Sequence, residues 1–272
     1  MLSLLIKISL CSRWLCQCLT LWCQWCSGEL AAALSDCSPL TQLCPTGPEV
    51  TEPRWPKWNE DDLSVSLQGV AADTISHLDD LGRTITGLEI YDCTDLTAGS
   101  LEPLTRCREL QDLSVTAADL PLLRGQLPEG LRRLNVRDCT DLTTGSLETL
   151  TRCPELRYLT LSGGVPDTVS LEPLTRCPEL QYLTLSGGVP DSVLDSLSGC
   201  PGLLVKSCRK LCHLYLHCTA DTGRAVLTAL KEADLRDSNG WTRTIRLSVP
   251  GELYRQLESQ SGDGVGVYWW RD

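Results

Sequence analysis

The stretch Leu150-Thr-Arg-Cys153-Pro-Glu-Leu156-Arg-Tyr-Leu159-Thr-Leu161 is followed by a near copy of itself, Leu174-Thr-Arg-Cys177-Pro-Glu-Leu180-Gln-Tyr-Leu183-Thr-Leu185. An earlier version, Leu104-Thr-Arg-Cys107-Arg-Glu-Leu110, also leads into an alternating apolar run. A period of roughly 20 to 30 residues with this internal spacing predicts a solenoid of stacked repeats. Solenoids of this kind present extended binding surfaces, so the pattern favours binding over catalysis.

The repeats can be aligned on the first apolar residue of each run. These residues are Ile85, Leu110, Leu131, Leu156, Leu180 and Leu211, with Thr242 as a degenerate seventh, and the run Leu63 to Leu67 is expected to be an opening strand. Alternating apolar positions predict a short parallel strand in each repeat. A Ser-Leu-Glu segment then predicts a short convex helix, with Ser100, Ser146 and Ser170 as candidate helix-capping residues.

Two repeats carry a longer signature, Leu88-Glu-Ile90-Tyr-Asp-Cys93-Thr-Asp-Leu96-Thr and Leu134-Asn-Val136-Arg-Asp-Cys139-Thr-Asp-Leu142-Thr. This signature resembles the cysteine-containing leucine-rich repeats of ribonuclease-inhibitor-like proteins and of the substrate-binding part of F-box adaptors. Gly164 and Gly188 replace the second cysteine in two later repeats. The resemblance implies an α/β leucine-rich-repeat solenoid with a parallel concave sheet and short convex helices or turns.

The chain divides into three segments by composition. Residues 1–58 form an apolar leader rich in Cys and Trp, followed by a proline-rich linker, and are expected to be poorly ordered. Residues 59–249 form the solenoid, and residues 250–272 form a C-terminal cap. Contact with a membrane is expected only if the leader, residues 1–28, acts as an anchor.

The net charge of −11 constrains the type of partner. Residues 1–58 carry four basic and four acidic side chains, so the acidic excess lies in the repeats. Nucleic-acid affinity depends on Lys and Arg that neutralise phosphates, so we expect no nucleic-acid partner. A basic or neutral protein surface is the expected counterpart.

Sixteen cysteines would suit a secreted disulfide scaffold, but their spacing points elsewhere. Cys107, Cys153, Cys177 and Cys208 each lie three residues before the first leucine of a run, so one repeat position explains four of them. Stacking of that position predicts a column of buried, reduced thiols. We therefore expect a cytoplasmic protein, with a secreted or membrane-anchored protein as the alternative through residues 1–28.

Strand positions three, five and seven of each run alternate with the leucines and should face the concave side. Tyr and Arg are common interface anchors, whereas near-identity of two repeats could by itself produce Tyr158 and Tyr182. Arg133 and Arg137 could meet a carboxylate-rich partner or pair with Glu89 and Asp112. The candidate partner-binding residues are Glu89, Tyr91, Asp112, Arg133, Asn135, Arg137, Tyr158, Tyr182, His213, Tyr215 and His217, and Arg246 faces the same side.

Catalytic and metal-binding chemistry has weak support in the sequence. Cys208, Cys212, His213, His217 and Cys218 are residue types that bind zinc, but a strand separates the two histidines by about 13 Å. The Gly-rich segments lack the lysine of a phosphate loop. We expect no metal, no cofactor and no enzymatic activity.

These observations predict a non-enzymatic scaffold that binds a protein partner on its concave face. The family resemblance implies substrate recognition for a ubiquitin ligase. The alternative is the ligand-sensing repeat region of an innate immune receptor.

Overall fold

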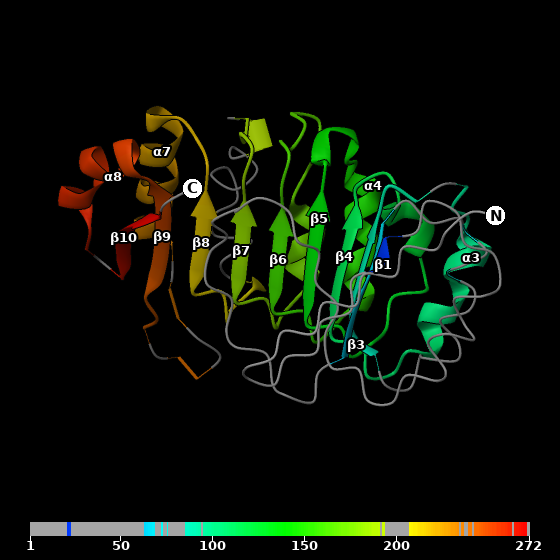
Figure 1. Ribbon diagram of the computed structural model, residues 1–272. Coiled ribbons are helices and arrows are strands. Elements are labelled where there is room, and N and C mark those ends of the chain that lie inside the picture. The colour runs from blue at the N-terminus through cyan, green and yellow to red at the C-terminus, as the bar shows by residue number, and fades with distance from the viewer. Residues whose placement is uncertain are drawn as a thin grey trace, which may run out of the picture.

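The structure is a computed structural model. It describes residues 21–22, 63–68, 72, 75, 85–93, 95–190, 192–193, 207–233, 235–236, 239–240, 242–262 and 264–270. Within these residues the strands form one parallel sheet whose spatial order is the order of the chain. Figure 1 shows the strands from β4 (Asp112–Thr116) to β8 (His213–Leu216) side by side, with their arrows pointing the same way. Because each strand adds next to the preceding one, the chain winds as a solenoid, which confirms the predicted leucine-rich-repeat fold class.

The strands are short, as expected for stacked repeats. They are β1 (Leu21–Trp22), β2 (Leu63–Gln68), β3 (Ile85–Tyr91), β4 (Asp112–Thr116), β5 (Arg133–Arg137), β6 (Tyr158–Leu161), β7 (Tyr182–Leu185), β8 (His213–Leu216), β9 (Ile245–Pro250) and β10 (Val265–Trp270).

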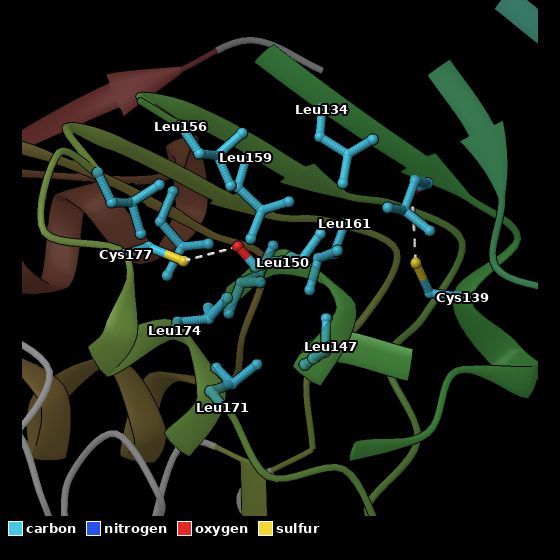
Figure 2. Close-up of a cluster of buried hydrophobic side chains, with 14 of the residues drawn as sticks. Leu134, Cys139, Leu147, Leu150, Leu156, Leu159, Leu161, Leu171, Leu174 and Cys177 are labelled. Atoms are coloured by element: carbon cyan, nitrogen blue, oxygen red, sulfur yellow. Dashed lines mark hydrogen bonds between the residues drawn. The ribbon is translucent and has the colours of Figure 1, made fainter. Parts of the chain in front are cut away.

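Leucine side chains fill the space between the sheet and the convex segments. In β6, β7 and β8, buried leucines alternate with half-buried residues, as the sequence pattern predicts. Figure 2 shows Leu147, Leu150, Leu171 and Leu174 of the convex segments on the side of the sheet where the strand leucines Leu159 and Leu161 lie. Each buried leucine contributes about 1.5–3 kcal/mol of transfer free energy, so a continuous aliphatic column holds the repeats together.

The convex segments combine short α-helices with 3-10 helices. The helices are α3 (Ala98–Leu101), η2 (Glu102–Arg106), η3 (Leu120–Leu123), η4 (Cys139–Asp141), α4 (Thr144–Leu147), η5 (Glu148–Arg152), η6 (Glu172–Arg176), α7 (Ala220–Glu232), α8 (Gly251–Leu257) and η7 (Glu258–Gln260).

Threonines, and not the predicted serines, cap two of these helices. The side chains of Thr97 and Thr143 accept hydrogen bonds from the backbone N–H groups of Ser100 and Ser146. The caps therefore lie three residues earlier than expected, because each helix begins before the Ser-Leu-Glu segment. Ser170 precedes Leu171, the N-cap residue of η6, and its hydroxyl accepts a hydrogen bond from the Glu172 N–H at 3.2 Å.

The cysteine before each run occupies the predicted buried position. Cys107, Cys153, Cys177 and Cys208 are at most 1% exposed, and all four are free thiols. The Cys177 thiol donates to the Leu150 carbonyl of the preceding repeat, as Figure 2 shows, and Cys208 donates to the Leu174 carbonyl. These two thiols thus link adjacent repeats.

A left-handed residue follows each of several strands and turns the chain toward the convex side. Asp92 and Asp138 adopt φ of 51° and 52°, and Gly163 and Gly187 take the same repeat position with φ of 90° and 84°. The glycines are needed because a Cβ on Gly163 would lie 2.9 Å from Asp138 Cα. Backbones of neighbouring repeats touch at this turn.

Both ends of the sheet differ from the simplest reading of the sequence. At the first end, β1 pairs with β2, so two residues of the expected leader add a strand outside the expected opening strand. The rest of residues 1–58 lies outside the described residues, as does the expected insertion around residues 198–202.

At the other end, the segment expected to be a cap contains β10, which pairs with β9 over six residues, Val265 to Trp270. The pairing of β8 with β9 places Arg246 opposite His213, which puts Thr244, rather than Thr242, at the first repeat position. Because the shift is two residues, Arg246 keeps its predicted face.

Candidate interaction face

The strand register builds one continuous column of side chains on the open face of the sheet. Asp112 lies beside Arg133, Arg133 beside Tyr158, Tyr158 beside Tyr182, and Tyr182 beside His213. All five come from the third position of their repeats. We call these residues, with Arg246 opposite His213, the third-position column.

The middle of the third-position column is a stack of aromatic rings. The ring centroids of Tyr158 and Tyr182 are 4.5 Å apart with an interplanar angle of 14°, and those of Tyr182 and His213 are 4.3 Å apart at 8°. Tyr215 lies next to His213 at 6.2 Å. Parallel strands space equivalent residues at about 4.8 Å, which is close to ring-stacking distance, so the sheet itself sets the stack.

Arginines lie at both ends of the aromatic stack. The Arg133 guanidinium lies 4.9 Å from the Tyr158 ring centroid, and its Nε is 3.4 Å from Asp112 Oδ1. Of the two alternatives expected for Arg133, the structure shows the ion pair with Asp112. At the opposite end, the exposed Arg246 guanidinium lies 5.3 Å from the ring of Tyr268.

Partial burial shifts the titration of the stacked groups. Burial, with the nearby charge of Arg246 as the second cause, lowers the pKa of His213, so the imidazole is neutral near pH 7. Burial also raises the pKa values of the Tyr182 and Tyr215 hydroxyls, which therefore stay protonated. The stack presents neutral hydrogen-bonding groups at neutral pH.

The other predicted residues lie around the third-position column, and one of them is covered. Tyr91 is only 9% exposed, and the Arg137 guanidinium lies 4.3 Å from its ring centroid. Arg137 thus packs on Tyr91, a contact across two strands that the sequence alternatives did not include. Glu89 and Asn135 are half-buried, and His217 is exposed just beyond β8.

Sequence reasoning missed Tyr268 as a neighbour of this face. It is 43% exposed and lies on β10, in the segment expected to be a cap. The alternation from Gly264 to Trp270 predicts the strand, but only its parallel pairing with β9 brings Tyr268 beside Arg246.

The described residues contain no cluster of three or more Cys, His, Asp or Glu side chains placed to hold a metal ion. His213 is stacked between Tyr182 and Tyr215, and Cys208 is buried in the thiol column. Burial raises the pKa of Cys208 to about 12, which keeps the thiol protonated and unreactive. No described helix combines the length and apolar composition of a bilayer-spanning segment.

Comparisons with known protein families, sequences and structures do not identify a family for this chain. No protein-family model and no curated protein sequence matches this chain. Among solved structures, the crystal structure of Listeria monocytogenes InlP is similar over 70% of this chain and 62% of its own, with 16% identity and a TM-score of 0.26.

The plant peptide hormone receptor RGFR1, in complex with RGF2, is similar over 88% of this chain and 54% of its own, with 14% identity and a TM-score of 0.16. This chain therefore spans less than two thirds of either protein. The leucine-rich-repeat fold assignment rests on the strand order, the buried leucines and the repeated turns.

Proposed function

We propose that this chain is a non-enzymatic protein-interaction scaffold that binds its partner on the concave face from β5 to β9. The observation that carries this proposal is the stack of Tyr158, Tyr182 and His213 on an open sheet face. Aromatic residues dominate binding hot spots because they offer a large contact area and a polar tip.

The geometry favours a binding role for the aromatic stack over the alternative that the stack is a by-product of repeat duplication. Duplication accounts for Tyr158 and Tyr182, whose repeats are nearly identical. It does not account for His213, which belongs to a divergent repeat and continues the same stack at 4.3 Å. Because the rings already hold one another in place, binding would cost little further side-chain entropy.

Capture of partners from cells tests the proposal. The wild-type chain is compared with a variant carrying Tyr158→Ala, Tyr182→Ala and Tyr215→Ala. The matched control carries Ala at Arg106, Arg152 and Arg176, which are exposed and share one position on the convex side. We expect the tyrosine variant to lose the partners that the control retains. Equal capture of every partner by all three proteins would refute the proposal.

We further propose substrate recognition for a ubiquitin ligase as the biological context, with ligand sensing in an innate immune receptor as the alternative. The support for the first is the cysteine signature at Cys93 and Cys139, which resembles the repeats of F-box adaptors. Recovery of ligase assembly subunits with the natural full-length protein would favour the ligase. Recovery of a nucleotide-binding or death-fold effector would favour the receptor.

A further inference from the structure

The concave face has a charge distribution opposite to that of the whole chain. The chain carries a net charge of −11. On the strands β6 to β9, however, the outward positions hold Tyr, Thr, Ser, His and Arg, and none of these described strand residues is Asp or Glu. The acidic residues of the open face, Glu89 and Asp112, lie on β3 and β4. The C-terminal half of the face is therefore locally neutral to positive.

The stacked rings expose their edges rather than their faces. Tyr182 has Tyr158 at 4.5 Å on one side and His213 at 4.3 Å on the other, and Arg133 covers the outer face of Tyr158. A ligand cannot stack on faces that are already occupied, which disfavours an aromatic, sugar or cationic ligand. Ring edges carry partial positive charge, and the phenolic O–H groups are donors, so the exposed surface suits an anionic acceptor.

Arg246 adds a full positive charge at the end of the stack. It is exposed, and among the described residues no carboxylate forms an ion pair with it. Arg133, by contrast, is paired with Asp112. The ring of Tyr268 lies beside the Arg246 guanidinium and limits its movement, leaving its planar donors able to bind a carboxylate in a bidentate manner.

We propose that the surface formed by Tyr182, Tyr215, Arg246 and their neighbours on β6 to β9 binds an acidic peptide segment. A Glu or Asp carboxylate pairs with Arg246, and neighbouring carboxylate or carbonyl oxygens accept hydrogen bonds from the tyrosine hydroxyls. This inference rests on the proposed function of the concave face. It reverses the basic or neutral partner expected from net charge, because a bound segment responds mainly to charges within about 8 Å at physiological salt.

Binding of matched peptides tests the charge of the ligand. Fluorescent peptides with alternating Glu and Gly, Gln and Gly, or Lys and Gly are titrated with the full chain at about 0.15 M ionic strength, and anisotropy is measured. We expect the Glu peptide to bind about tenfold or more tightly than the Gln and Lys peptides, the scale of one charge-assisted hydrogen bond. Equal binding of the Glu and Gln peptides would overturn the proposal, as would tighter binding of a phosphorylated peptide or an RNA.

Matched charge reversals test the location. Arg246→Glu should weaken binding of the Glu peptide by about tenfold or more, whereas Arg176→Glu, on the convex side, should leave it within about twofold. Equal weakening by both variants would show a nonspecific charge effect and refute the site. Both arginines are exposed, and far-UV circular dichroism of each variant verifies that the fold is retained. If cellular partners require the tyrosines but the Glu peptide does not bind, this inference fails while the proposed function stands.

Discussion

Gly187 and Gly188 provide a matched pair for testing whether contact between neighbouring backbones stabilises the solenoid. Both have positive φ, 84° and 90°. A Cβ on Gly187 would lie 2.5 Å from the Gly164 nitrogen and 2.9 Å from the Gly163 nitrogen, whereas a Cβ on Gly188 would meet nothing within 4 Å. Alanine at the two positions therefore differs mainly in the steric clash.

The expected magnitudes follow from these distances. Alanine in a left-handed conformation costs about 1–2 kcal/mol, and Gly188→Ala should lower the free energy of unfolding by that amount. Gly187→Ala adds overpacking of about 1–3 kcal/mol, because the clash is with backbone that cannot rotate away. We therefore expect a total loss of roughly 2–5 kcal/mol for Gly187→Ala.

Urea denaturation followed by far-UV circular dichroism measures both losses. The comparison uses unfolding midpoints together with transition slopes, because a change in slope would show that the repeats no longer unfold together. Equal destabilisation by the two substitutions would refute the reasoning. It would mean that φ strain alone, and not backbone contact between the repeats, limits these positions.

Two further predictions concern titration. Burial raises the pKa of Cys153 and Cys208 to about 12 and that of Cys177 to about 11, so their stabilising contribution should be complete below the ordinary thiol pKa of 9.0 and be lost as the pH rises toward 11–12. Site-resolved iodoacetamide labelling at pH 8 should modify these three only after denaturant is added, and rapid labelling of the native chain would contradict the buried column. The lowered pKa of His213 should give an NMR titration midpoint below the ordinary 6.5, with the signal assigned through His213→Gln. The stability that neutral His213 contributes is present above pH 6.5 and is lost as the pH falls through the lowered pKa of His213 in the folded protein. An NMR titration midpoint at or above 6.5 would contradict the burial of His213 in the stack.

The repeat pattern was sufficient to predict the fold and the face of many strand residues. Leu159 and Leu183 are buried while Tyr158 and Tyr182 are half-exposed, as strict alternation requires. The cysteine spacing likewise predicted a buried column. These features depend on a local pattern of residues that recurs in every repeat, so each repeat supports the same prediction.

The helix starts and the sheet ends were less accessible from sequence. Thr97 and Thr143 cap their helices because each helix begins three residues earlier than the Ser-Leu-Glu segment suggests. The strands β1 and β10 lie in segments with little repeat signature, so their pairing depends on the neighbouring strand that receives them.

The amino-acid sequence alone determined that this protein is a leucine-rich solenoid, that the thiols of Cys107, Cys153, Cys177 and Cys208 are buried and that Tyr and His side chains share one face. Only the tertiary structure decided that Arg133 pairs with Asp112, that Arg137 covers Tyr91 and that Arg246 lies beside Tyr268. The physical reason is that periodicity specifies which way a side chain points along its own strand. The register and crowding of neighbouring strands then decide what that side chain touches, and so which charges and ring edges remain for a partner.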